Sequence, residues 1–132
     1  MKKIVYSSKE HSEIFGMARV GYIKNIYEIY VNTNDDGMIP HFHLRDKNNW
    51  SRFHTCIRID SAEYFLHGNK DDKLNSSLKK ALQNFMVSRI TNSKYSDRFE
   101  NNWELVCFLW DMNNERNPVP EDISQPDYSE LD

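Results

Sequence analysis

Cysteine, glycine and proline are scarce in this chain, whose 132 residues include two cysteines, four glycines and four prolines. Two cysteines cannot build the disulfide framework of a small secreted domain. Cys56 and Cys107 stand in alternating or apolar surroundings, which are typical of buried thiols. The sequence has no Gly-rich phosphate loop, Walker motif, zinc-finger spacing or internal repeat. We therefore expect a protein of a reducing, cytoplasmic compartment with none of the common nucleotide-binding signatures.

Long apolar runs and an excess of basic charge are also missing. No stretch approaches the ~20 apolar residues of a membrane span. The first residues include two lysines but no apolar segment or cleavage site of a signal peptide. The net charge of −3 does not favour a general nucleic-acid-binding protein. The sequence thus predicts no membrane partner and favours a protein partner over a nucleic acid.

The charge is distributed unevenly along the chain. Residues 117–132 carry five acidic residues and no Lys or Arg, so residues 1–116 have a net charge of +2. We predict a single α+β domain over 1–116, in which 1–16 form an N-terminal extension, and a flexible acidic tail over 117–132. The tail is either a solvated terminus or a surface that covers a basic groove on a partner. Its candidate contact residues are Glu121, Asp122 and Asp127.

Apolar and polar residues alternate in four segments, with the period of half-buried β-strands. The first two segments, around 17–22 and 27–32, flank Lys24-Asn25, which predicts a tight turn. The second two, 38–45 and 52–59, flank a polar loop and form a second hairpin. Residues 64–67 are a candidate fifth strand.

Two helices follow the strands. Apolar residues between Leu78 and Ile90 recur on one helical stripe, and Asn75 is placed to cap this helix. The segment Trp103–Met112 is apolar on most of its circumference, so it either lies centrally against the sheet or forms a homodimer interface. The predicted fold is α+β: an antiparallel sheet of four to five strands, built from two hairpins and packed against two C-terminal helices.

The second hairpin contains the only chemically distinctive group of residues. If Arg45 and Arg52 pair across the loop, an antiparallel ladder places His43 opposite His54 and His41 opposite Cys56. Imidazole and thiolate ligands suit zinc or another divalent transition metal, so His41, His43, His54 and Cys56 are the candidate metal ligands. The alternative is that these residues are ordinary polar neighbours on an exposed sheet face, an interpretation favoured by the three arginines nearby.

His41-Phe42-His43 resembles the His-hydrophobe-His motif of single-strand endonucleases from rolling-circle replication and small transposases. In those enzymes the two histidines bind a divalent metal, and a tyrosine attacks the phosphodiester. The resemblance implies Tyr95 or Tyr64 as the nucleophile here. Arg58 is our candidate for holding the phosphate.

A broader resemblance covers residues 38–112. Pro40-His41-Phe42-His43, the amphipathic segment 78–90 and Asn102-Trp103-Glu104-Leu105 are similar to an uncharacterised bacterial family of small Pro-His-x-His proteins. Members of that family look like toxin–antitoxin or mobile-element cargo. The resemblance implies a protein from a bacterium, a phage or a mobile element.

No complete catalytic constellation accompanies these features, so the sequence favours a non-enzymatic protein-interaction module. Trp50, at the tip of the second hairpin, is a good anchor for a protein partner, with Arg45 and Arg52 beside it. We expect an inhibitor of a host nuclease or defence protein. The alternative function is a metal-dependent phosphodiesterase or single-strand nuclease that uses the His-x-His strand.

Overall fold

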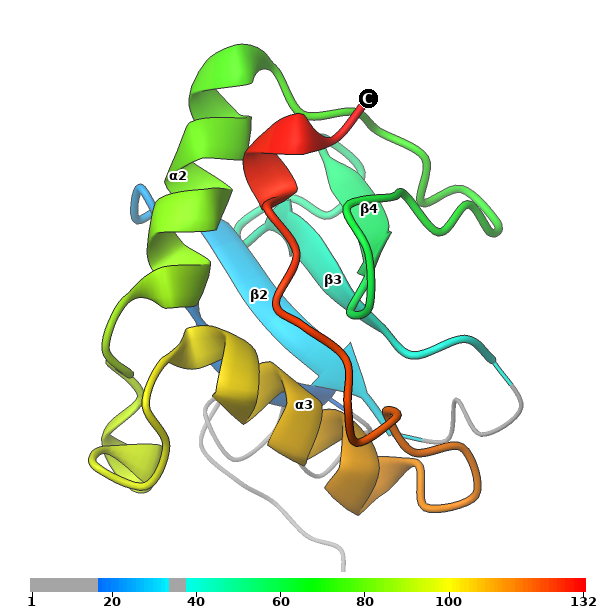
Figure 1. Ribbon diagram of the computed structural model, residues 1–132. Helices are drawn as coiled ribbons and strands as arrows, with labels where there is room; N and C mark the ends of the chain where they lie inside the picture. Colours follow the sequence, from blue (N-terminus) through cyan, green and yellow to red (C-terminus); the bar gives the residue numbers. More distant parts are fainter. Residues whose placement is uncertain (1–16, 34–37) are drawn as a thin grey trace, which may run out of the picture.

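The computed structural model describes residues 17–33 and 38–132, so the predicted N-terminal extension lies outside the described residues. Four strands form one antiparallel sheet in the order β1-β2-β3-β4. Two helices, α2 and α3, and the C-terminal segment cover one face of this sheet (Figure 1). The predicted α+β class, with the helices C-terminal to the strands, is confirmed.

The first hairpin joins β1 (Met17–Ile23) to β2 (Tyr27–Asn32). Lys24 and Asn25 have φ values of 55° and 56°, which is the left-handed conformation of a tight hairpin turn. Asparagine tolerates this conformation better than most residues. The turn predicted at Lys24-Asn25 is therefore confirmed.

The second hairpin joins β3 (His41–Asp46) to β4 (His54–Arg58) in a register that differs from the predicted one. His43 lies opposite Cys56, and Arg45 lies opposite His54. The predicted pairs His43–His54 and His41–Cys56 are wrong by two residues. Two residues are one full period of a strand, so the side chains remain on the predicted face.

Asp46 explains the shift in register. It belongs to β3, and its Oδ1 accepts hydrogen bonds from the backbone N–H groups of Asn48 and Asn49 at 2.8 and 3.0 Å. These bonds start the turn one residue later than predicted, and the backbone N–H of Asp46 donates to Phe53 across the turn. Arg52 therefore belongs to the turn and does not pair with Arg45.

Residues 60–74, here called the edge segment, run beside β4 without forming a regular fifth strand. The backbone N–H of Phe65 donates to Cys56, and that of Asp72 donates to His54. In place of a continuous ladder, the segment forms isolated bridges to β4 at Tyr64 and Asp71. The sheet thus has four strands in the described residues, and the edge segment covers the border of β4.

Both helices begin at asparagine caps. Asn75 accepts a hydrogen bond from the Leu78 N–H at the start of α2 (Ser76–Val87), which confirms the predicted cap. Asn101 plays the same role for α3 (Asn102–Asn113). A short 3-10 helix, η1 (Ser93–Tyr95), lies between the two. No helix in the described ranges has the length and apolar character needed to cross a membrane.

Most of the apolar circumference of α3 is buried or half-buried within one chain, although Met112 is 55% exposed. Leu105, Val106, Leu109 and Trp110 are buried, and the helix contacts β1, β2, β3 and α2. The C-terminal segment passes along its other side (Figure 1). The structure thus shows the central packing against the sheet, one of the two predicted arrangements of this helix, and the homodimer interface stays a prediction.

The C-terminal segment, residues 117–132, is not the free tail predicted from its acidic composition. Tyr128, in the 3-10 helix η2 (Tyr128–Glu130), is fully buried, and Leu131 is 2% exposed. The Tyr128 hydroxyl donates to the Ile59 carbonyl at 2.9 Å, and its ring meets that of Phe42 edge-on. The apolar side chains between the acidic ones complete the hydrophobic core, which outweighs the charge of the segment.

Candidate metal centre

The face of the sheet opposite the hydrophobic core carries polar side chains from three neighbouring strands. Because partners in adjacent strands share a face, the side chains form rows across β2, β3 and β4. The rows are Tyr30–His43–Cys56 and Glu28–Arg45–His54. Most of these residues are buried, so the predicted solvent-exposed face is wrong. A buried group of this polarity needs partners within the protein or a bound ligand.

Four side chains on this face converge on one point. His41, His43, Cys56 and His67, here called the His/Cys cluster, each offer one ligand atom, and all four atoms lie within 4.8 Å of one another. The first three residues are fully buried, and His67 is partly buried. The cluster could therefore hold a metal ion.

The spacing within the His/Cys cluster is close to that of a tetrahedral site. Typical zinc–nitrogen and zinc–sulfur bonds place ligand atoms about 3.3–3.7 Å apart. The Cys56 sulfur is 3.3 Å from His43 Nδ1 and 3.3 Å from His67 Nε2. The ring centroid of His41 is 5.1 Å from that of His43 and 5.3 Å from that of His67. Small side-chain movements would bring the donor atoms into bonding positions.

The tautomer of His41 is the one that a metal ligand requires. Its Nδ1 lies 2.8 Å from the Ile39 carbonyl oxygen, which can only accept, so Nδ1 carries the proton. The lone pair is then on Nε2, and this atom is buried. Metal-binding histidines commonly donate their second ring N–H to a backbone carbonyl in this way.

The environment of the cluster favours neutral imidazole rings. Burial lowers the pKa of His43 well below its usual value of 6.5, and the neighbouring His41 and His54 add to this effect. The neutral ring is the form that binds a metal ion. His43 is therefore ready to act as a ligand at neutral pH without first losing a proton.

His54, predicted as a ligand, lies beside the cluster and not in it. Its Nε2 is 3.0 Å from the Tyr30 hydroxyl oxygen and 3.0 Å from His43 Nδ1. Its backbone N–H donates to Asp72 of the edge segment. Burial, Lys70 and Arg45 lower its pKa to about 4. The two-residue shift in register places His54 opposite Arg45, so it becomes a neighbour of the ligands.

His67, which was not among the predicted ligands, takes the fourth position. It belongs to the edge segment, just before a turn in which Gly68 has a φ of 63°. The candidate strand at 64–67 was the available signal, because a segment paired along β4 brings a histidine to Cys56. Alternation alone does not show which strand the segment 64–67 pairs with.

The predicted partner-binding residues of the second hairpin fall into two groups. Arg45 is 4% exposed and donates to the Glu28 carboxylate, so it is not available to a partner as predicted. Its guanidinium lies 3.5 Å from the ring of Trp50. Trp50 itself is 51% exposed, and the side chain of Arg52 is 73% exposed. The hairpin tip thus presents Trp50 and Arg52 at the surface.

The predicted acidic contact residues also differ in their surroundings. Glu121 and Asp122 are exposed. Asp127 is exposed too, but its Oδ1 caps η2 by accepting hydrogen bonds from the backbone N–H and the hydroxyl of Ser129. Glu121 and Asp122 are therefore the carboxylates best placed to meet another molecule.

The candidate catalytic residues have structural contacts elsewhere. Arg58 pairs with Asp60 at 2.9 Å, and this hydrogen bond raises the pKa of the guanidinium. Tyr64 and Tyr95 both pack against the hydrophobic core. The tyrosine that the fold does bring to the cluster is Tyr30, whose ring stacks on His43 at 4.6 Å. Burial raises the pKa of Tyr30, which makes it a poor nucleophile.

Comparison of the chain with family models, with curated proteins and with solved structures finds no match. No relative therefore assigns a role to the His/Cys cluster or to the exposed hairpin tip. The resemblance of Pro40–His43 and its flanking segments to small Pro-His-x-His proteins stays a prediction. The chemistry of the chain has to be inferred from its own donor atoms and surfaces.

Proposed function

We propose that this chain is a zinc-binding protein-interaction module. The observation that carries the proposal is the convergence of four donor atoms, from His41, His43, Cys56 and His67, within 4.8 Å of one another. The donors come from β3, β4 and the edge segment. Burial of three imidazoles and a thiol costs hydration free energy, and bonds to a metal ion would compensate for that cost.

The donor set selects the type of metal. Three nitrogen donors and one sulfur donor suit Zn²⁺ in tetrahedral geometry. Mg²⁺ and Ca²⁺ prefer oxygen ligands, and no carboxylate is among the four donors. Zinc is therefore the ion that we assign to this site.

A site with four protein ligands favours a structural role for the metal. Catalytic zinc sites usually keep one position for water or substrate, whereas structural sites are closed. Here His67 would connect the edge segment to the two strands of the second hairpin. The zinc would then fix the edge segment along β4, where backbone pairing is sparse.

The interaction role is supported by the surface of the second hairpin. Trp50 is a large exposed aromatic residue at the tip, and Arg52 is exposed beside it. Aromatic and arginine side chains are the usual anchors of protein interfaces. We propose that the hairpin tip and the exposed carboxylates Glu121 and Asp122 bind a protein, and that inhibition of a host nuclease or defence protein is the outcome.

The phosphodiesterase alternative has less support. It needs an open metal position and a reactive tyrosine near the ion. Tyr95 belongs to the hydrophobic core, Tyr64 packs against the core, and Tyr30 is buried with a raised pKa. No tyrosine in the described ranges combines contact with the His/Cys cluster and the reactivity that a nucleophile for phosphoryl transfer needs.

Metal analysis of the purified full chain tests the zinc proposal. We expect one zinc ion per chain, and a thiolate-to-metal charge-transfer band after replacement by Co²⁺. Cys56→Ser should remove the band and most of the zinc, while the matched variant Cys107→Ser should retain both. A chain that takes up no zinc or cobalt on reconstitution, or equal losses in the two variants, would contradict the proposal.

The two neighbouring histidines give a second comparison. His67→Gln removes a proposed ligand, whereas His54→Gln removes only a contact of His43. A chelator should lower the melting temperature of the unchanged chain, because bound zinc stabilises the native state by about 2.7 kcal/mol at a free zinc concentration of 100 times the dissociation constant. In His67→Gln, which has lost a ligand, the chelator should have no such effect. We expect His54→Gln to keep a chelator effect, with zinc affinity about 10–100-fold weaker. The opposite order would show that His54 is the ligand.

A further inference from the structure

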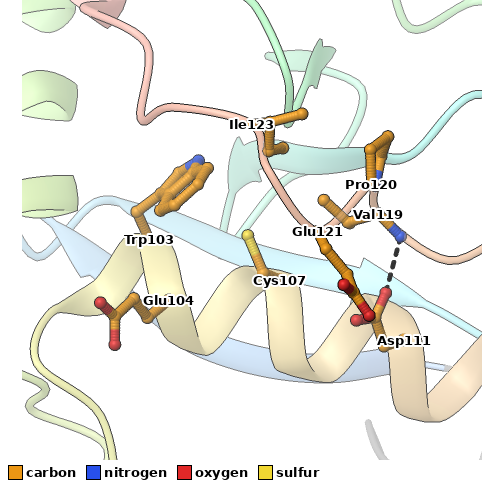
Figure 2. Close-up of a pocket in the computed structure, with 8 residues that line it drawn as sticks. All are labelled: Trp103, Glu104, Cys107, Asp111, Val119, Pro120, Glu121 and Ile123. Atoms are coloured by element: carbon orange, nitrogen blue, oxygen red, sulfur yellow. Dashed lines mark hydrogen bonds between the residues drawn. The ribbon is translucent and has the colours of Figure 1, made fainter.

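A second candidate binding site lies between α3 and the C-terminal segment (Figure 2). The cavity has a volume of about 250 Å³. Its apolar lining comes from Trp103 and Cys107 of α3 and from Val119 and Ile123 of the C-terminal segment. Pockets for small molecules typically measure about 300–1,000 Å³. This cavity is smaller, so it suits one inserted side chain better than a metabolite.

The charged residues around the cavity are all acidic. Glu104, Asp111 and Glu121 line it, and none of the eight lining residues is Lys, Arg or His. Asp111 uses Oδ1 to accept the Val119 N–H at 2.8 Å, which fixes the wall and leaves Oδ2 for another donor. Figure 2 shows Asp111 and Glu121 together at one end of the cavity and Trp103 at the other. The cavity is therefore complementary to a positive charge.

The aromatic end of the cavity is held in place. The indole N–H of Trp103 donates to the Ile59 carbonyl at 3.1 Å, which fixes the ring against the sheet. A fixed indole offers a wall on which apolar groups of an inserted chain can pack without ordering the ring first. At the acidic end, a planar guanidinium can donate two parallel hydrogen bonds to one carboxylate, which an ammonium cannot.

We propose that this cavity receives an arginine side chain of a protein partner. The proposal deepens the protein-binding part of the proposed function and does not depend on the zinc. The methylene groups of the arginine would pack on Cys107 and Ile123. Its guanidinium would meet the carboxylates of Asp111 and Glu121. The partner surface that binds here is basic, so the acidic C-terminal segment contributes a specific pocket as well as general attraction.

The experiment is a titration of the ¹⁵N-labelled full chain with the blocked peptide acetyl-Gly-Gly-Arg-Gly-Gly-amide, followed by amide and indole chemical shifts. The same peptide with citrulline in place of arginine is the matched probe, because citrulline keeps the shape and loses the charge. We expect shifts at the Trp103 indole N–H and at the amides of Cys107 and Val119, with millimolar affinity. The citrulline peptide should bind at least tenfold more weakly.

Two glutamate variants test whether the arginine peptide binds in this cavity. Glu121→Gln should weaken binding of the arginine peptide at least threefold, whereas Glu130→Gln, an exposed change in the same segment and outside the cavity, should leave it unchanged. Equal binding of the two peptides, equal effects of the two variants, or shifts confined to other parts of the chain would overturn the proposal. Zinc stoichiometry, measured on the same samples, reports separately on the metal centre.

Discussion

Arg45 shows how much a single buried side chain depends on its neighbours. Its guanidinium lies between two aromatic rings, 4.2 Å from that of Tyr30 and 3.5 Å from that of Trp50. The Nε and Nη2 groups donate to Glu28 Oε1 at 3.1 and 2.8 Å. The side chains of both charged residues are less than a tenth exposed. The pair therefore combines a large desolvation cost with strong mutual attraction.

Removing one member of this pair should destabilise the fold strongly. Arg45→Met leaves the Glu28 carboxylate buried without its partner, and we expect a loss of about 3–5 kcal/mol in the free energy of unfolding. The double variant Arg45→Met with Glu28→Gln should recover most of that loss, because no buried charge remains. Urea unfolding of the two variants measures the difference. A double variant as unstable as the single one would show that packing of the arginine dominates.

Cys107 should make the fold sensitive to alkaline pH. Burial raises the pKa of its thiol to about 12, above the usual 9.0, and Asp111 and Glu104 add to this effect. Above about pH 9 the unfolded chain loses this proton and the folded chain keeps it. Stability therefore falls as the pH rises toward 12, by up to about 1.4 kcal/mol per pH unit from this group.

The variant Cys107→Ala isolates this contribution. Its free energy of unfolding should decline less steeply between about pH 9 and about pH 11 than that of the unchanged chain, by roughly 1 kcal/mol per pH unit. Denaturant unfolding at several pH values gives both slopes. If the slopes are the same, the thiol ionises equally well in the folded and unfolded chain.

At the scale of the elements, local signals predicted most of the fold. Alternation gave the strands, Lys24-Asn25 gave the first turn, and Asn75 gave the start of α2. Each of these signals acts within a few residues, where the sequence alone determines the preference. The sequence therefore predicted the α+β class and the side of the sheet on which the histidines lie.

The composition of the candidate metal site depended on contacts between distant residues, and only part of it could be predicted. His41, His43 and Cys56 belong to the cluster as expected, because a two-residue shift keeps them on one face. The exchange of His54 for His67 follows from the turn at Asp46 and from the path of the edge segment. The turn and the path of the edge segment depend on individual backbone hydrogen bonds. They leave no periodic pattern in the sequence from which they could be predicted.

The two asparagine caps allow a test of how α3 is connected to the rest of the molecule. Each cap accepts one backbone N–H, so Asn75→Ala should cost about 1 kcal/mol. Asn101 also donates through its Nδ2 to Gln125 of the C-terminal segment. We expect Asn101→Ala to cost about 2 kcal/mol, because a second hydrogen bond is lost. Thermal or urea unfolding distinguishes the two, and equal losses would mean that the bond to Gln125 adds nothing.

At the scale of the whole molecule, the C-terminal segment belongs to the core. Tyr128 is fully buried against Phe42, and its backbone N–H donates to Gln83 of α2. The segment therefore connects α2 to the centre of the sheet. Its acidic side chains remain at the surface, which explains why composition alone predicted a free tail.

Substitution of Tyr128 tests this assignment. Tyr128→Ala should reduce the free energy of unfolding by about 3–5 kcal/mol, as for other large aromatic side chains in a core. Tyr128→Phe removes only the hydroxyl, which donates to the carbonyls of Ile59 and Arg58 at 2.9 and 3.1 Å, and should cost about 1 kcal/mol. Calorimetry or urea unfolding of the full chain measures both. A flexible tail would instead give no change in either variant.

The late position of Tyr128 and Leu131 in the chain has a consequence for biosynthesis. The ribosome makes the polypeptide from its N-terminus, so the sheet and both helices emerge before the residues that close the core over Phe42 and Ile59. Until then a strip of apolar surface stays open to water and to other nascent chains. A nascent chain that has emerged only as far as about residue 120 would display a partly folded intermediate that attracts chaperones, and emergence of residues 121–132 would end that attraction.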